Sequence, residues 1–241
     1  MQSFKTISRF AGLGYLVIFI TGIVSNFAIL ENIIVPGDAA ATSANIINQE
    51  SLFRTGMLGF VIMVIFDLFL TWALYLLLKP VSRDLSLLSA WMRLVNVSIF
   101  AVALFHLFTI LNISNNAAYL DVFDPQQLHA QIMLSLDDFN NTWLIGLIFF
   151  GLHLGILGYL IVKSGYIPKF IGVLLFLASG GYLADSFAHI LLSDYEKYKD
   201  LFSMIVIVPG VIGELSLTFW LLFKAGKLSE KAKAIGNIQE S

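Results

Sequence analysis

Residues 149–168 read FFGLHLGILGYLIVKSGYIP, and this stretch decides the class of fold. Its first fourteen residues carry no charged side chain. The run ends at Lys163, and the helix-breaking residues Gly165 and Pro168 follow. Upstream, the apolar run extends to Thr142, so it reaches the roughly 20 residues that an α-helix needs to cross a bilayer. We therefore expect a membrane-spanning helix with one polar side chain, His153, inside it.

Five further segments have the same character as this one. None of the six segments contains Lys or Arg, and they cover residues 10–30, 55–78, 94–113, 142–162, 170–192 and 201–223. The composition agrees, since 58% of the residues are hydrophobic and only 12% are charged, whereas soluble proteins keep about 25% charged. We expect an all-α polytopic membrane protein with six transmembrane helices, over about 10–30, 55–78, 90–113, 142–162, 170–192 and 201–223.

The basic residues predict the orientation of these helices. If both termini and the turns 79–93 and 163–169 share one side, that side carries eleven basic residues and the other side three. Positive charge collects on the cytoplasmic side of membrane proteins, so we expect both termini inside (N-in/C-in) and a location in the inner (plasma) membrane. The three residues on the opposite side are Arg54, Lys197 and Lys199.

The segments between the spans suggest one transmembrane domain over 1–228 and a flexible cytoplasmic tail over 229–241. Asp124 and Pro125 are typical of a helix start, and Leu128, Ile132 and Leu136 then form an apolar stripe. We expect an external amphipathic helix over about 125–138. Asp38 is expected to cap a short helix in the first external connection.

Three ionisable residues share one depth in the membrane. Asp67 lies 12 residues before Lys79, while His153 and Glu214 each lie ten residues before a lysine that ends the span. At about 1.5 Å per residue, all three lie roughly 15–18 Å from the cytoplasmic helix ends. In a hydrocarbon core about 30 Å thick, this depth is the midplane.

Charges at this depth are unfavourable by at least about 2.5–3.5 kcal/mol, so they face the protein interior and need partners. Arg93 lies one turn inside the third helix, and its long side chain can reach the midplane. Asn96 shares its face. One alternative is a hydrogen-bonded network that only specifies helix packing. We favour a functional site formed by Asp67, Arg93, Asn96, His153 and Glu214.

A second polar layer lies nearer the outer face. Asp185 and His189 are four residues apart on the fifth helix, so they lie one above the other, and His106 is expected at similar depth. Asp185 and His189 are candidate ligand-binding residues. With His106 they form a weak candidate for a zinc site, because the D-x-x-x-H pattern lacks the specificity of H-E-x-x-H. An Asp–His hydrogen bond is the simpler interpretation.

Several classes of chemistry have no support in the sequence. The chain contains no cysteine, which excludes disulfides, thiolate metal sites and attached c-type haem. We find no nucleophile motif and no phosphate-binding loop, so we expect no cofactor and favour a non-enzyme. No basic patch indicates nucleic acid. The expected partners are the lipid bilayer and a small lipophilic ligand, and a homo-oligomer is left open.

Long blocks of the chain resemble one bacterial family. They include RTGMLGFVIMVIFDLFLTWALYLLLKPVSR (54–83), the AWMRLVN stretch around Arg93, residues 149–187, and PGVIGELSLTFWLLFKAGK (209–227). These blocks resemble the DUF4386 family, a group of uncharacterised multi-pass membrane proteins. The resemblance implies a six-helix membrane protein and implies no activity. Asp67, Arg93, His153, Asp185 and Glu214 all fall inside the similar blocks.

Three hypotheses of function follow from these patterns. The favoured one is binding or transport of a small lipophilic or protonatable ligand at the midplane cluster. The second is an intramembrane metal-assisted hydrolase that uses His106, Asp185 and His189. The third is a non-catalytic membrane partner or immunity-type protein, in which the polar residues only specify the fold.

Overall fold

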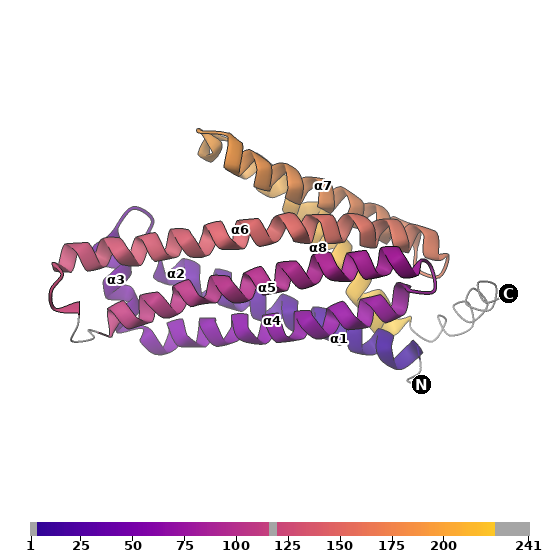
Figure 1. The fold of residues 1–241 in the computed structure, drawn as a ribbon, viewed down its shortest axis with the longest axis horizontal. Helices are drawn as coiled ribbons and strands as arrows, with labels where there is room; N and C mark the ends of the chain where they lie inside the picture. Colours follow the sequence, from indigo (N-terminus) through magenta and orange to yellow (C-terminus); the bar gives the residue numbers. More distant parts are fainter. Residues whose placement is uncertain (1–3, 116–119, 225–241) are drawn as a thin grey trace. The chain divides into compact units, whose positions relative to one another are not determined.

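Helices make up most of the part of the chain that the computed structural model describes, residues 4–115 and 120–224 (Figure 1). No strand occurs in these two ranges. The elements in order are α1 (Phe4–Ile23), the π-helix η1 (Val24–Leu30), α2 (Glu31–Ile33), α3 (Ala39–Asn48), α4 (Glu50–Leu78), α5 (Arg83–Ser114), α6 (Pro125–Ser164), α7 (Lys169–Leu191), the 3₁₀-helix η3 (Tyr195–Lys197) and α8 (Lys199–Phe223).

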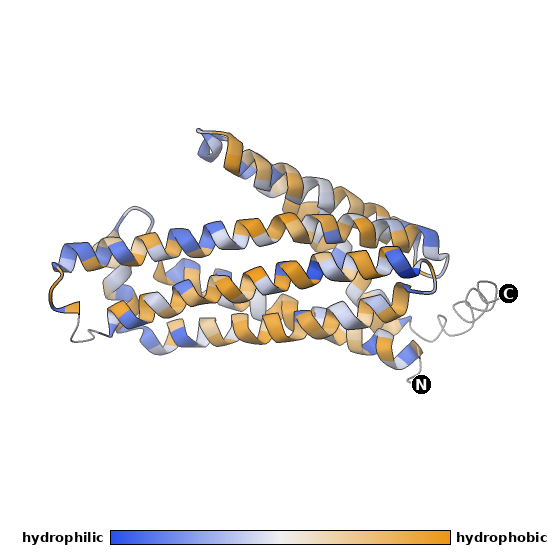
Figure 2. Cartoon of the chain, viewed as in Figure 1, coloured by the Kyte–Doolittle hydropathy of each residue, from blue (hydrophilic) through white to orange (hydrophobic). Residues whose placement is uncertain are grey.

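Six helices are long and apolar enough to cross a membrane: the continuous segment Phe4–Ile33, which joins α1, η1 and α2, and then α4, α5, α6, α7 and α8. Apolar residues dominate the middles of these helices, and hydrophilic residues gather mostly near the ends (Figure 2). A helix is suited to this environment because it satisfies its own backbone hydrogen bonds in lipid. The prediction of an all-α protein with six membrane spans is confirmed. The N-in/C-in orientation stays a prediction.

The packing divides the chain into two compact units. One unit contains residues 1–16, 66–97 and 145–241, and the other contains residues 17–65 and 98–144. The polar residues at the predicted midplane, together with α7 and α8, belong to the first unit. The π-helix, α3 and His106 belong to the second. Each unit is described by itself below.

The turns follow from residues that favour them. Pro80 follows the end of α4, and Gly165 has a φ of +68° in the turn between α6 and α7. That left-handed conformation suits glycine, which has no Cβ. Asp38 caps α3, because its Oδ1 accepts a hydrogen bond of 2.9 Å from the backbone N–H of Ala41. The cap expected at Asp38 is therefore confirmed.

The structure differs from the sequence prediction in two helices. Residues 125–138 do not form a separate helix, because α6 runs without a break from Pro125 to Ser164. No proline or glycine lies between residues 126 and 145, so nothing in that stretch interrupts the helix. Likewise, α5 begins at Arg83 rather than near residue 90. The predicted tail over 229–241 lies outside the described residues.

Two close helix contacts hold α6, α7 and α8 together. A Cβ added to Gly172 of α7 would lie 2.6 Å from the carbonyl oxygen of Gly158 on α6. A Cβ added to Gly181 would lie 2.7 Å from the carbonyl oxygen of Ile205 on α8. That carbonyl is the one that Pro209, four residues later, leaves without its usual backbone donor. Small residues allow membrane helices to approach this closely.

The orientation can be tested with reporter fusions at residues 85, 120, 166 and 196. Positive charge predicts that the fusions at 85 and 166 report a cytoplasmic location and those at 120 and 196 an external one. An external signal at 85 or 166 would overturn the orientation.

The close contact between α6 and α7 predicts that Gly172→Ala destabilises the protein by about 1–3 kcal/mol, because the new methyl group meets backbone atoms. Thermal unfolding of the purified protein in detergent measures the effect. Gly180→Ala is the matched control on the same helix, since nothing lies within 4 Å of its added Cβ. Equal stability of the two variants would contradict the close approach.

Candidate functional site

Arg93 is the centre of a buried polar cluster in the first unit. Its residue is only 1% exposed, and it lies near the middle of α5, away from both helix ends. Because a guanidinium stays protonated, it brings a permanent positive charge into the span. Such a charge is tolerated only where carboxylates, other acceptors or aromatic faces surround it. The neighbouring helices provide all three.

The first partner of Arg93 is Asp67 on α4, which is also buried. The Nε and Nη2 atoms of Arg93 both donate to Oδ1 of Asp67, each at 2.5 Å. These charge-assisted bonds join α4 to α5 with both charges removed from solvent. Thr71, one turn further along α4, donates to the backbone carbonyl of Asp67 at 2.9 Å.

The second partner is His153 on α6, and its contacts determine which ring nitrogen carries the proton. The Nη1 atom of Arg93 lies 3.0 Å from Nε2 of His153. A guanidinium N–H can only donate, so Nε2 accepts and carries no proton. Nδ1 lies 2.9 Å from the backbone carbonyl of Ser89, which can only accept, so Nδ1 carries the proton. His153 is therefore a neutral imidazole protonated at Nδ1.

Ser89 completes the link between α5 and α6. Its Oγ lies 2.9 Å from Nδ1 of His153 and donates a longer bond of 3.5 Å to the backbone carbonyl of His153. Ser89 is 4% exposed. The imidazole is thus held from both sides of its ring, by a serine on one side and an arginine on the other.

Aromatic rings cover the guanidinium. The ring centroids of Tyr15 on α1 and Phe150 on α6 lie 5.4 Å and 5.5 Å from Cζ of Arg93, within the range of cation–π contacts. Phe150 also packs edge-on against Tyr182 of α7, with centroids 5.2 Å apart. The rings exclude solvent from the ion pair and connect α1 and α7 to it.

Glu214 on α8 differs from the other charged residues of the cluster. It interacts electrostatically with Arg93 and Asp67. Within residues 4–115 and 120–224, however, no hydrogen bond or ion pair reaches its carboxylate; only its backbone carbonyl is bonded, to Thr218 at 2.7 Å. Its side chain is half-buried, whereas Asp67 and Arg93 are buried. The cluster therefore contains one carboxylate that has no hydrogen bond or ion pair within the described chain.

The cluster draws one residue or more from every membrane span. Its members are Tyr15 (α1), Asp67 (α4), Ser89 and Arg93 (α5), Phe150 and His153 (α6), Tyr182 (α7) and Glu214 (α8). The structure thus brings Asp67, Arg93 and His153 into direct contact and places Glu214 within electrostatic range. The similar depth of Asp67, His153 and Glu214 in the sequence predicted this grouping. The role of these residues in binding a ligand stays a prediction.

Asn96 has a different neighbour. It lies one turn beyond Arg93, and its Nδ2 donates to the backbone carbonyl of Gly146 on α6 at 3.0 Å. Its Oδ1 is buried and has no hydrogen-bond partner among the described residues. Asn96 therefore ties α5 to α6, and no contact with Asp67, His153 or Glu214 is present in that part of the chain.

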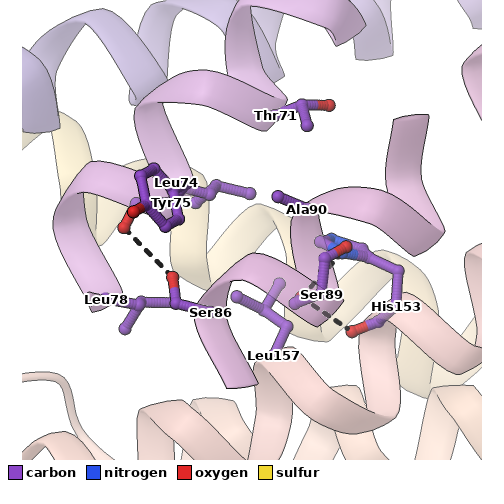
Figure 3. A pocket seen from close by; sticks show the side chains of 9 residues that line it. All are labelled: Thr71, Leu74, Tyr75, Leu78, Ser86, Ser89, Ala90, His153 and Leu157. Atoms are coloured by element: carbon purple, nitrogen blue, oxygen red, sulfur yellow. Dashed lines mark hydrogen bonds between the residues drawn. The ribbon is translucent and has the colours of Figure 1, made fainter. Parts of the chain in front are cut away.

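A narrow cleft lies beside His153, between α4, α5 and α6 (Figure 3). Its enclosed volume is about 0 Å³, so it does not hold a ligand in this arrangement. The hydroxyls of Ser86 and Ser89 are already bonded to Tyr75 and His153. The residues that line it are Thr71, Leu74, Tyr75, Leu78, Ser86, Ser89, Ala90, His153 and Leu157.

The outer polar layer forms a separate contact within the first unit. Asp185 accepts a hydrogen bond of 2.6 Å from the hydroxyl of Tyr195 in η3, and the ring of His189 lies 4.3 Å from the ring of Tyr195. Burial, and then this hydrogen bond, raises the pKa of Tyr195, so the phenol stays a donor. Asp185 and His189 therefore anchor the connection between α7 and α8.

The weak zinc candidate gains nothing from this geometry. His106 belongs to the second unit, where its Nε2 lies 3.3 Å from the hydroxyl of Thr142. Across the described ranges, no group of three or more His, Asp or Glu side chains is arranged to hold a metal ion. The Asp–His hydrogen bond expected between Asp185 and His189 is not found among the described residues, because Asp185 accepts from Tyr195 instead.

Four contributors were missed or misplaced by the sequence analysis. Tyr15, Ser89 and Phe150 carry no signal in an apolar helix, because a lone aromatic or serine there is ordinary. Tyr182 was not assigned to the inner cluster, although its ring packs on Phe150 there. Residue spacing along one helix cannot reveal which ring of another helix covers a charge.

The fold and the buried charge cluster define a class, the polytopic α-helical membrane protein with an ion network between its spans. The family can then be stated. Residues 10–225 match the family described as "Domain of unknown function (DUF4386)", and the chain belongs to this family.

One relative extends this similarity to an archaeon. An "Uncharacterized protein" of Archaeoglobus fulgidus is 33% identical over 174 residues, which is 72% of this chain and 86% of the relative. No solved structure matches the chain significantly. The resemblance seen in the sequence is therefore confirmed, and one relative is archaeal.

The buried ion pair predicts a large asymmetry between two substitutions. Asp67→Ala leaves Arg93 charged and without its main acceptor, so we expect a loss of about 3–5 kcal/mol in the free energy of unfolding. Glu50→Ala is the control, because the Glu50–Arg54 pair is exposed and contributes at most about 0.5 kcal/mol. Thermal unfolding in detergent measures both, and equal losses would show that Asp67 does not neutralise Arg93.

Proposed function

We propose that this protein binds a small lipophilic cation or protonatable amine, with the carboxylate of Glu214 as its counter-ion. The observation that carries the proposal is the unpaired, half-buried carboxylate of Glu214 beside an otherwise satisfied ion network. The other charged or titratable groups around it, Arg93, Asp67 and His153, are bonded to one another within the described chain.

The charge balance supports a cationic ligand. Arg93 contributes one positive charge, Asp67 and Glu214 are the two carboxylates, and His153 is neutral in its hydrogen-bonded form. With Asp67 paired to Arg93, an ionised Glu214 leaves one negative charge in a membrane span. That state is unfavourable unless a cation or a proton compensates it. An amine supplies either, as an ammonium ion or by sharing its proton.

The surroundings of Glu214 suit an apolar molecule with one charged end. Gly210 lies one turn before Glu214 on α8, and an added Cβ there would meet the ring of Tyr182 only at 3.7 Å. Tyr182 and Tyr15 both interact electrostatically with Glu214. Aromatic faces favour organic cations. The side chain of Glu214 is half-buried.

The two other hypotheses lack a comparable feature. An intramembrane hydrolase needs several ligands around a metal, and the described residues do not gather them. A protein whose polar core only specifies the fold gains nothing from a carboxylate that pairs with no side chain. We propose the inner (plasma) membrane as the location, with the orientation that the reporter fusions test.

The proposal is tested with the purified protein in detergent, using tetraphenylphosphonium and n-decylamine as probes. A ligand at ten times its Kd adds about 1.4 kcal/mol of stability, so both probes are expected to raise the melting temperature of the natural chain. In Glu214→Gln this rise is expected to disappear, because the amide keeps the shape and removes the charge.

Asp185→Asn is the matched control, since Asp185 is a half-buried carboxylate on α7 that Tyr195 already engages. It is expected to keep the full response to both probes. A natural chain that neither cation stabilises, or a Glu214→Gln variant that responds as the natural chain does, contradicts the proposal.

A further inference from the structure

Tyr15 has a hydroxyl group that no contact in the described chain explains. The residue is 2% exposed, and its hydroxyl oxygen has no hydrogen-bond partner among residues 4–115 and 120–224. Other buried tyrosines of the same unit behave differently. Tyr166 donates to the carbonyl of Leu77 at 2.6 Å, and Tyr195 donates to Asp185 at 2.6 Å. A buried hydroxyl without a partner is unfavourable, so native proteins rarely keep one.

The position of Tyr15 connects this hydroxyl to the site around Glu214. The ring of Tyr15 covers Arg93, with 5.4 Å between the ring centroid and Cζ. The hydroxyl interacts electrostatically with Arg93, Glu214 and Asp67. Its oxygen interacts with Arg93, whose N–H groups can only donate, so the O–H of Tyr15 itself is left without an acceptor in the described chain.

Both groups interact with Arg93, and each is incomplete: the O–H of Tyr15 on α1 lacks an acceptor, and the carboxylate of Glu214 on α8 has no hydrogen bond or ion pair in the described chain. A single ligand satisfies both if it carries a positive nitrogen with an acceptor oxygen close to it. A simple alkylamine satisfies Glu214 alone. Glu214 thus requires a positive charge on the ligand, whereas Tyr15 requires an acceptor oxygen.

We propose that the ligand is an amphiphilic amino alcohol, whose ammonium pairs with Glu214 while its neighbouring oxygen accepts a hydrogen bond from Tyr15. This inference rests on the proposed function, since it assigns the second contact of the same ligand. Tyr15 is then the residue that selects among lipophilic amines, and Glu214 is the residue that binds them as a class.

The test compares two probes of equal chain length, n-decylamine and 1-aminodecan-2-ol, with the full chain in detergent. Binding is measured from the ligand dependence of the melting temperature. The natural chain is expected to bind the amino alcohol about fivefold more tightly, the ratio that one net hydrogen bond gives. In Tyr15→Phe this ratio is expected to fall to about one, with the affinity for n-decylamine unchanged.

Two controls separate selection from folding. Tyr159→Phe removes a hydroxyl from a 47% exposed tyrosine and is expected to keep the fivefold preference. Without ligand, Tyr15→Phe is expected to melt at or above the temperature of the natural chain, because it removes a buried hydroxyl that has no partner.

Each outcome decides between the two proposals. If n-decylamine binds through Glu214 but the natural chain shows no preference, or if Tyr15→Phe keeps the preference, the role of Tyr15 is wrong and the amine site stands. If neither amine stabilises the natural chain, both proposals are wrong.

Discussion

The guanidinium of Arg93 is the constraint on which the rest of the inner unit depends. A permanent charge inside a membrane span must be surrounded, and five of the other helical segments contribute to doing so: α4 with Asp67, α6 with His153 and Phe150, α1 with Tyr15, and α7 and α8 through Tyr182 and Glu214. Helices in lipid gain little from apolar contact alone, since lipid tails are equally apolar. A shared buried charge specifies which faces turn inward, and the close glycine contacts between α6, α7 and α8 then fix how near the helices come.

The same arrangement distinguishes the residues that stabilise the fold from those that remain available to a ligand. Asp67 and His153 are both bonded to Arg93: Oδ1 of Asp67 takes two donors from it, and the imidazole is bonded through both nitrogens. Groups held this firmly stabilise the fold and leave little to offer a ligand. Two members of the cluster lack a partner in the described chain: the carboxylate of Glu214 has no ion pair, and the hydroxyl of Tyr15 has no hydrogen bond. Glu214 and Tyr15 are therefore the residues that remain available to a ligand, although His153 is the more conspicuous residue in the sequence.

Much of this could be predicted from the sequence, for physical reasons that also mark its limits. The bilayer requires long apolar helices, so the six spans follow from charge-poor runs, and distances of ten to 12 residues from terminal lysines place Asp67, His153 and Glu214 at similar depth. The partners of each residue could not be predicted. Residue spacing along one helix does not show how that helix is rotated about its axis relative to its neighbours. Phe150 and Tyr182 are ordinary apolar-helix residues until their rings are seen together. The helix over 125–138 was wrongly separated from the span that follows it, since its polar residues suggested an end where no breaker interrupts α6.

Arg93 donates to His153 as well as to Asp67. This contact makes His153 a neutral ring protonated at Nδ1, and it leaves Glu214 without an ion pair in the described chain. The nitrogen chemical shifts of ¹⁵N-labelled histidine in the protein, reconstituted into lipid bilayers and assigned by comparison with His153→Gln, test it most directly. We expect one protonated nitrogen, Nδ1, and one unprotonated nitrogen, Nε2, and we expect Arg93→Met to change the chemical shift of Nε2. Two protonated nitrogens, or a proton on Nε2, would contradict it.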